Sequence, residues 1–173
     1  MADSNRRSIY EGKVVRLGLE TVTLPHGVTI DLEVIRHPGA AAVVPVHEDG
    51  SVTLIYQHRH AAGGMIYEVP AGKLEPLEDP ILCAGRELEE EVQLRAGTLT
   101  HLSTIYTTPG FTDEQIHLYK ATDLTPASEA QPEADEFIEV VRLPPAEVLQ
   151  MIRDGRIVDG KSICALFLAL TGS

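Results

Sequence analysis

The sequence predicts an α+β fold with a mixed β-sheet. This prediction comes from the order of the hydrophobic patterns along the chain: strand-like segments, one helix, further strand-like segments and two closing helices. A chain of 173 residues is long enough for one well-buried domain and too short for two ordinary ones. The pattern alone leaves several strand topologies open.

The first strands are expected between residues 9 and 36, as two or three antiparallel strands with a turn at His26 and Gly27. In the second half of this segment apolar and polar side chains mostly alternate, a pattern typical of a half-exposed sheet. The alternating apolar positions are Val28, Ile30, Leu32 and Val34.

Two apolar segments follow, at residues 40–50 and 51–60, and we expect them to form a hairpin that turns around residues 48–50. Residues 65–73 read as a short extended segment, which Pro70 interrupts because proline cannot donate to a strand ladder.

A helix is expected from about Pro80 to about Val92. Asp79 is a favourable N-cap, and proline is tolerated in the first helical position because no amide donor is needed there. Ile81, Leu88 and Val92 then share one apolar stripe.

The second half of the chain contains strands, a polar loop and the closing helices. Residues 125–135 are acidic, contain two prolines and read as a loop. The final helix is apolar nearly all round, so we expect it to be buried. The remaining elements are strands at 99–109, 115–124 and 137–144 and helices at 145–155 and about 162–170.

The predicted helix at Pro80 carries a cluster of carboxylates. Residues four apart lie on neighbouring turns of one face, so Glu87 and Glu91 are stacked with Glu90 beside them. Like charges at this spacing destabilise a helix, and a divalent cation that takes hard oxygen ligands would compensate. The alternative is a solvated Glu-rich surface, and Glu89 is expected to be such a surface residue.

Composition excludes several classes of function. A net charge of −12 argues against non-specific nucleic-acid binding, and no apolar run is long enough to span a membrane. The first residues have no hydrophobic core after their charges, so they are not a signal peptide. Cys83 and Cys164 lie among apolar neighbours, which favours two buried free thiols in a reducing compartment over the alternative of a disulfide. We therefore expect a cytoplasmic protein.

The segment from Gly72 to Leu94 resembles the Nudix box, G-x5-E-x7-R-E-U-x-E-E-x-G-U, where U is a bulky aliphatic residue. Its fixed polar positions are filled by Glu78, Arg86, Glu87, Glu90 and Glu91, and its two aliphatic positions by Leu88 and Leu94. Gln93 stands where the box has glycine, and a side chain in the left-handed conformation costs roughly 1 kcal/mol.

The resemblance implies a Nudix-type α/β/α sandwich and hydrolysis that depends on Mg²⁺, with Mn²⁺ as a substitute. Its implied metal ligands are the carboxylates of Glu87, Glu90 and Glu91 and the carbonyl of Ala71. Glu90 is also counted with the catalytic residues, as is Arg86, which in the family pairs with the first box glutamate and orients the others.

Further motifs resemble the ADP-ribose pyrophosphatase branch of the family. They are residues 57–59, the Glu-Val-Pro-Ala-Gly lead-in at 68–72, Pro109 with the loop to residue 114, and the Gly-Lys-Ser-Ile start of the last helix at 160–163. The resemblance implies cleavage of ADP-ribose to AMP and ribose 5-phosphate. It also implies a division into N-terminal strands at 1–38, through which such enzymes form homodimers, and a Nudix hydrolase domain at 39–173.

The same resemblance gives the remaining site residues. Arg59 is the candidate for the substrate phosphates, Arg36 for the adenine or its ribose, and Phe111 and Glu114 for further substrate contacts. The general base is expected on the acidic loop, with Glu136 as the first candidate and Glu133 as the second.

Two other functions compete with this one. The first is a Nudix hydrolase that acts on another nucleoside diphosphate derivative, a dinucleotide or a nucleoside triphosphate. The second is a Nudix domain that senses ADP-ribose without cleaving it. Sensor domains usually lose box glutamates, whereas Glu87, Glu90 and Glu91 are all present.

Overall fold

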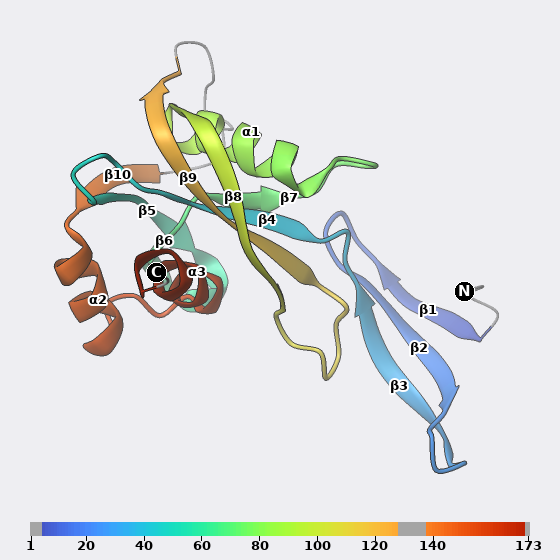
Figure 1. Cartoon of the computed structure of the whole chain (residues 1–173). Helices are drawn as coiled ribbons and strands as arrows, with labels where there is room; N and C mark the ends of the chain where they lie inside the picture. Colours follow the sequence, from blue (N-terminus) through green and yellow to red (C-terminus); the bar gives the residue numbers. More distant parts are fainter. Residues whose placement is uncertain (1–4, 128–137, 172–173) are drawn as a thin grey trace.

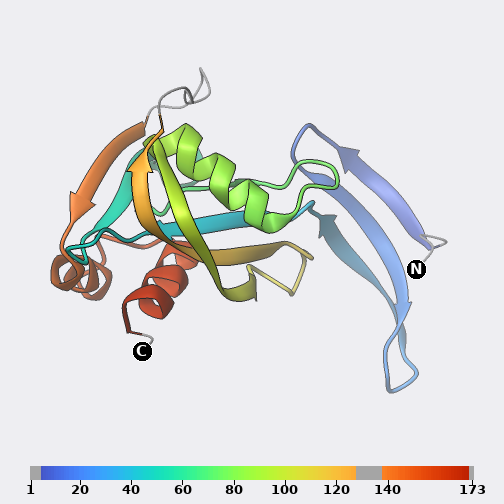
Figure 2. The same ribbon diagram turned by 45° about the horizontal axis from the view of Figure 1, so that its top comes forward.

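The computed structural model describes residues 5–127 and 138–171 and has the expected α+β architecture (Figure 1). A four-stranded mixed sheet has the order β7-β4-β9-β8, and a three-stranded sheet has the order β10-β5-β6. Helices α1 (Pro80–Val92) and α3 (Gly160–Thr171) pack on opposite faces of the mixed sheet, as Figure 2 shows. The fold is therefore a layered α/β/α arrangement, in agreement with the prediction.

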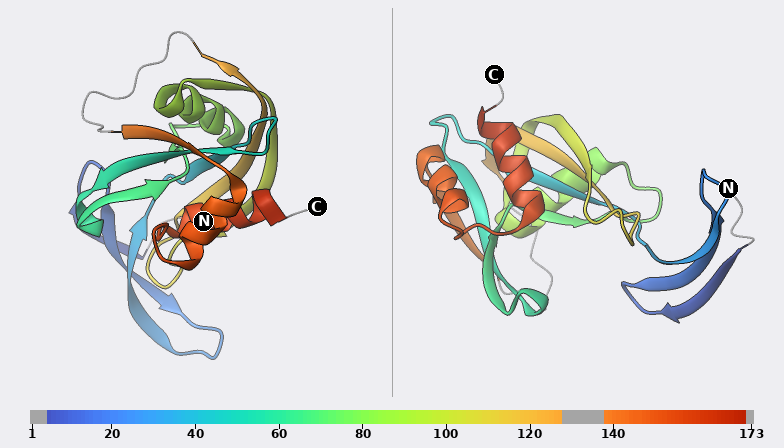
Figure 3. Two further views of the ribbon diagram at one scale, coloured as in Figure 1. Left: turned by 90° about the vertical axis from the view of Figure 1, so that its left-hand side faces the viewer. Right: turned by 90° about the horizontal axis from the view of Figure 1, so that it is seen from below.

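A separate antiparallel sheet projects from this body at the N-terminal end (Figure 3). Its strands are β1 (Arg6–Glu11), β2 (Arg16–Thr23) and β3 (Thr29–Arg36), which pair in sequence order as predicted. The end of β3 is fastened to the body because the Ile35 N–H donates to the Phe111 carbonyl over 2.8 Å.

Strand β4 (Ala40–Pro45) is the centre of the mixed sheet. Its side chains alternate between two hydrophobic cores, so that Ala42 and Val44 face α3 whereas Ala41 and Val43 face α1. All six of its residues are buried. A strand covered on both faces reads as a continuous apolar run, as here.

The predicted hairpin of residues 40–50 and 51–60 is wrong. Strand β5 (Val52–Arg59) pairs with β6 (Gly64–Glu68) and β10 (Ile138–Leu143), whereas β4 pairs with β7 (Ala71–Lys73) and β9 (Gln115–Pro126). Both edges of β4 are thus occupied. The turn around residues 48–50 is present, because the His47 N–H donates to the Ser51 carbonyl over 2.9 Å and an isolated bridge joins Val46 to Val52, but the strands on either side belong to different sheets.

The extended segment at 65–73 belongs to both sheets of the body. Strand β6 ends at Glu68, and the chain crosses at Val69 and Pro70 to begin β7. The Pro70 carbonyl accepts a hydrogen bond of 2.9 Å from the Val43 N–H, which fixes the crossing against β4. Proline can take part in such pairing only through its carbonyl, because it has no backbone N–H.

Helix α1 has the predicted limits. The Asp79 side chain accepts from the Ile81 N–H at 3.1 Å, and Leu88 and Val92 are buried as expected. Ile81, however, is 38% exposed, and the buried face of the helix includes Cys83 and Ala84 instead.

The helix ends at Gln93, which adopts the left-handed conformation at φ 56° and ψ 38°. Its N–H still donates to carbonyls of the last helical turn, those of Leu88 and Glu89. The chain therefore leaves the helix by the route that a glycine would take, with a side chain in its place, and continues into β8 (Leu94–Tyr106).

Helix α2 (Pro145–Arg153) precedes α3. The expectation that this last helix, α3, is buried is wrong. Helix α3 packs on β4 and β9 through one face only, so Phe167 and Leu168 remain 39% and 42% exposed. Cys164 is exposed for the same reason, whereas Cys83 is buried. Within residues 5–127 and 138–171, no helix is both long and apolar enough to cross a membrane.

Candidate active site

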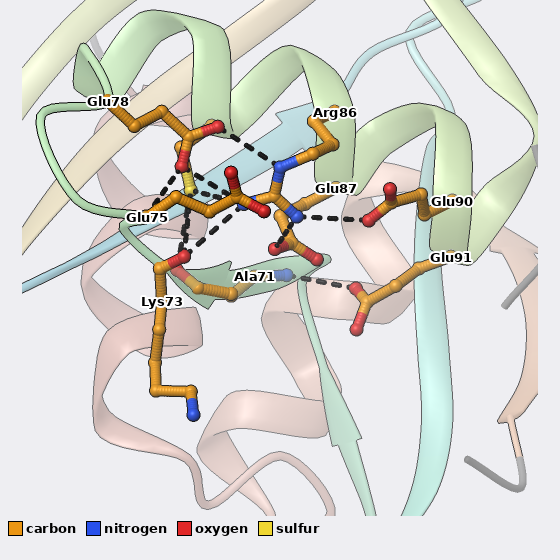
Figure 4. A network of polar contacts seen from close by, with 10 residues as sticks. Ala71, Lys73, Glu75, Glu78, Arg86, Glu87, Glu90 and Glu91 are labelled. Carbon is orange, nitrogen blue, oxygen red and sulfur yellow. Dashed lines mark hydrogen bonds and ion pairs between the residues drawn. The ribbon is translucent and has the colours of Figure 1, made fainter. Parts of the chain in front are cut away.

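The backbone of β7 passes directly beside the carboxylates of α1 (Figure 4). A Cβ atom on Gly72 would lie 1.8 Å from Oε1 of Glu87, so only glycine allows this approach. One residue earlier, the Ala71 N–H donates to Oε2 of Glu91 over 3.0 Å. Glu87 and Glu91 are both buried, and the close contact with β7 places them against backbone rather than solvent.

Arg86 lies at the centre of the carboxylate cluster. Its Nε and Nη2 atoms donate to Glu78 at 3.1 Å each, so the pairing with the first box glutamate is present. Its Nη1 atom also donates to Glu87 at 2.6 Å and to Glu90 at 3.0 Å. The Arg86 hydrogen bonds lower the pKa of Glu78, which keeps this carboxylate ionised.

These contacts offset much of the repulsion between the stacked glutamates. From the sequence alone, we expected a divalent cation to do this. Arg86 lies between Glu87 and Glu90, and Glu91 turns toward the Ala71 N–H. Across the described residues, no group of three His, Cys, Asp or Glu side chains is gathered in a way that could hold a metal ion. The predicted ligand set is therefore on one face but is not preformed.

The chemistry of the cluster nevertheless fits a hard divalent cation, because all its donors are carboxylate or backbone oxygens. Glu87 and Glu90 border a cavity of about 370 Å³ that also reaches Glu75 and Arg86. Because Gly72 has no side chain, the backbone of β7 lies close to the Glu87 carboxylate. A backbone oxygen and this carboxylate could therefore bind the same ion.

A larger cavity of about 790 Å³ lies on the other side of β7. The two cavities share β7 as a wall, because Ala71, Gly72 and Lys73 line both. The carboxylate face and the larger cavity are thus separated by a single strand. Further lining residues of the larger cavity are Val14, Arg59, Tyr106, Glu114, Asp159 and Lys161.

One wall of the larger cavity is organised by Glu68. Its carboxylate accepts two hydrogen bonds from Arg59, at 3.0 and 2.8 Å, and one from Lys161 at 2.9 Å. Gln57 donates a further bond of 3.0 Å. Burial would raise the pKa of Glu68, but the Arg59 hydrogen bonds and the Lys161 charge outweigh this effect and lower it.

The start of α3 is fixed to the same wall. Asp159 caps the helix, since its Oδ2 atom accepts from the Ser162 N–H at 3.0 Å and also contacts Lys161 at 2.9 Å. The Ser162 hydroxyl in turn accepts from the Val69 N–H at 2.9 Å. The helix that carries Lys161 is therefore bonded to the chain just after Glu68.

Glu114 lies on the cavity wall, as a substrate contact requires. Its Oε2 atom accepts from the Thr107 hydroxyl at 2.8 Å, and Oε1 lies 3.4 Å from Nδ1 of His37. Tyr106 is 55% exposed, so this side of the cavity offers an open aromatic ring.

Arg36 and Phe111 are not among the residues that line either cavity. Arg36 pairs with Glu20 and with Asp113, and both ion pairs raise its pKa. The Asp113 pair joins the N-terminal sheet to the loop before β9, whereas Glu20 lies on β2 of the same sheet. Phe111 is 51% exposed, so it does not anchor its loop in the core. Backbone hydrogen bonds to Ile35 hold this loop instead.

The remaining candidates divide between buried, exposed and undescribed residues. Burial raises the pKa of the Cys83 thiol to about 12, which excludes it as a nucleophile at neutral pH. Cys164 lines the larger cavity. Glu133 and Glu136, the candidate bases, lie outside the described residues.

Sequence reasoning missed two residues that line the larger cavity, Asp159 and Lys161, and also Glu68, which binds Lys161 from behind the lining. Glu68 and Lys161 belong to the motifs at residues 68–72 and 160–163. A charged side chain within each motif was the signal that could have identified them. Their association depends on contacts between β6 and α3, which are far apart in the sequence.

Comparisons with known proteins show which sequences and structures this chain is similar to. Residues 36–166 match the family model described as the NUDIX domain. A methanol dehydrogenase activator from Bacillus methanolicus is 41% identical over 159 residues, which cover 91% of this chain and 86% of the relative. An ADP-ribose pyrophosphatase from Bacillus subtilis (strain 168) is 38% identical over 162 residues, which cover 93% and 88%. A crystal structure of an ADP compounds hydrolase superposes with a TM-score of 0.81 at 24% identity, covering 95% of this chain and 89% of that one, and shares the fold.

Proposed function

We propose a hydrolytic function from the premise that this chain belongs to the NUDIX family. The protein is a pyrophosphohydrolase that cleaves the pyrophosphate bond of ADP-ribose, or of a related nucleoside diphosphate sugar, and ADP-ribose gives AMP and ribose 5-phosphate. The observation that carries this function is the single strand β7 between the carboxylates of α1 and a cavity lined by Arg59 and Lys161. The activator relative is named for an effect on a dehydrogenase, so its name gives no substrate to compare.

The reaction adds one water molecule across a phosphoanhydride. A water oxygen bonds to one phosphorus in line with the bridging oxygen, the bond from that phosphorus to the bridging oxygen breaks, and the water gives its proton to a base. Negative charge spreads over the phosphoryl oxygens, so positioning and charge neutralisation dominate the catalysis.

The carboxylates of Glu87, Glu90 and Glu91 and the carbonyl of Ala71 would hold Mg²⁺, with Mn²⁺ as a substitute. When bound, such ions neutralise phosphoryl charge and lower the pKa of a bound water. Arg86 then has a second role, because its bonds to Glu87 and Glu90 hold these carboxylates on the β7 side of the helix.

The substrate lies in the larger cavity in this proposal. Arg59 is 43% exposed at this wall and offers a planar donor surface to the phosphates. Glu114 also lines this cavity, which supports its role as a further substrate contact. Contacts from Arg36 and Phe111 remain proposals that require these side chains to leave the positions described above.

Glu136 is our first candidate for the general base and Glu133 the second. The register of β10 supports this choice, because Ile138 pairs with Gln57, and Gln57 contacts Glu68 at the cavity wall. Ile138, two residues after Glu136 in the sequence, thus lies beside a residue that contacts this wall.

Three further properties are part of the proposal. The N-terminal strands of residues 1–38 form a homodimer interface, and residues 39–173 form the hydrolase domain. The free thiols of Cys83 and Cys164 are compatible with a reducing cytoplasm.

The test is a panel of ADP-ribose, other nucleoside diphosphate sugars, NADH, diadenosine polyphosphates and nucleoside triphosphates, each with Mg²⁺ and with excess EDTA. We expect ADP-ribose to have the highest kcat/KM by about tenfold or more, with activity lost in EDTA and in Glu91→Gln. A different leading substrate supports the alternative hydrolase, and binding without turnover supports the sensor domain.

A further inference from the structure

Glu68 is a buried carboxylate that binds two cations from distant parts of the chain. Its side chain is 3% exposed, and Arg59 and Lys161 each contribute at least one hydrogen bond to it. Arg59 ends strand β5, whereas Lys161 is in the first turn of α3. The carboxylate therefore joins two elements that meet only at this wall.

Both cations face the larger cavity, and Glu68 itself is not among its lining residues. The side chains of Arg59 and Lys161 are 43% and 13% exposed, so part of each remains accessible from the cavity. Glu68 lies behind them and fixes their direction. Its two bonds to Arg59 define the plane of the guanidinium, which a single contact would leave free to rotate.

The charges of this wall cancel, because Asp159 also pairs with Lys161. Two cations and two carboxylates have no net attraction for an anion at long range. A buried ion pair is also weak support for stability, since desolvation offsets much of its attraction. The contribution of Glu68 is therefore to orient the hydrogen-bond donors of Arg59 and Lys161 at short range.

Glu68 is also connected to the carboxylate face. Three residues after it, the Ala71 N–H donates to Glu91, and between them the Val69 N–H donates to Ser162. The segment that follows Glu68 is thus bonded both to the start of α3 and to Glu91.

From these contacts we propose that Glu68 is a positioning residue that aims Arg59 and Lys161 at the phosphates of the bound substrate. This inference rests on the proposed function, and it assigns Glu68 an effect on substrate affinity through two other side chains. Glu68→Gln keeps the shape of the side chain and removes its charge. We expect KM for ADP-ribose to rise by about tenfold while kcat changes by less than about threefold.

Arg59→Lys is the second variant, because it keeps the charge and loses the two-bond geometry. We expect KM to rise by about fivefold in the wild-type background and to change by less than about twofold in Glu68→Gln, since Glu68 acts through Arg59. Glu89→Gln is the matched control, as it removes a carboxylate that binds Arg95 through two bonds on the exposed side of α1. Its KM should equal that of the wild type.

The outcomes are separable. A lower KM in Glu68→Gln would show that Glu68 only neutralises the wall, and a lower melting temperature with unchanged KM would show a purely structural role; either result overturns the inference. An equal effect of Arg59→Lys in both backgrounds also overturns it. If Glu68→Gln fails to fold, an unchanged KM in Arg59→Lys alone is sufficient to reject it. A wild type that hydrolyses no nucleoside diphosphate derivative overturns the proposed function instead.

Discussion

A methyl group on the α-carbon of Gly72 would stand 1.8 Å from Oε1 of Glu87, so the backbone of β7 passes directly against this carboxylate of α1. The strand is short, yet it separates the carboxylate cluster from the larger cavity and lines both sides. Gly72 therefore lines both the cavity that the metal-binding candidates border and the proposed substrate cavity. A larger residue at position 72 would displace the Glu87 carboxylate before any other group.

Gly72→Ala should reduce kcat/KM for ADP-ribose by about tenfold or more, because the new methyl group displaces the Glu87 carboxylate. The loss of stability should be about 1 kcal/mol, since the displaced atoms are the end of a flexible side chain. Steady-state kinetics and urea unfolding measure both quantities.

Gly85→Ala is the matched control for this substitution. Its added Cβ would lie 3.7 Å from Leu99, an ordinary contact, and alanine replaces glycine within α1. We expect stability to increase by about 1 kcal/mol with unchanged activity. Full activity in Gly72→Ala would refute the importance of the close approach.

Gln93→Gly should stabilise the protein by about 0.5–1 kcal/mol. Gln93 has φ 56°, a conformation that glycine adopts without the Cβ penalty, although greater freedom in the unfolded chain offsets part of the gain. The free energy of unfolding in urea measures the change. Gln93→Val should destabilise the protein, and equal stability of the two variants would contradict this account of the helix end.

The pairing of Arg86 with Glu78 predicts a pH-dependent stability. Arg86 lowers the pKa of Glu78 from its ordinary value of 4.5, so the folded state holds the ionised carboxylate better than the unfolded state does. This contribution is complete above the unfolded pKa and is lost as the pH falls through the lower folded pKa. Arg86→Met should therefore be less stable than the wild type by about 2 kcal/mol near pH 7.

The measurement is urea unfolding of both proteins in EDTA, at several pH values from about 7 down to about 3. We expect the difference between them to shrink at the acidic end. A difference that stays constant over this range would show that Arg86 contributes through packing rather than through the charge of Glu78.

The parts of the molecule that were predictable from the sequence are local. Helix α1 has the expected limits because Asp79 and Pro80 begin it through contacts within one turn. The glutamates of the cluster share a face because helical geometry alone places residues four apart together. Neither prediction needed a distant segment.

The parts that were not predictable depend on which distant strands and helices meet. The apolar run of β4 was taken for one arm of a hairpin, although burial on both faces is typical of a strand between two partners. The apolar composition of α3 did not show that only one face would find a partner. Glu68 and Lys161 lie 93 positions apart and meet only in the folded chain.

The assignment of the general base leads to the last prediction. Glu136→Gln should lower kcat for ADP-ribose by about 10²–10⁴-fold, with KM and Mg²⁺ dependence nearly unchanged, because a carboxamide keeps the shape of the side chain but cannot accept the proton of the attacking water. Glu133→Gln, in the same acidic loop, is the matched control and should keep most of the wild-type rate. A large loss in Glu133→Gln alone would transfer the role to Glu133. Near wild-type rates in both variants would place the base outside this loop, and the pH dependence of kcat in the double variant would then show whether a carboxylate is still involved.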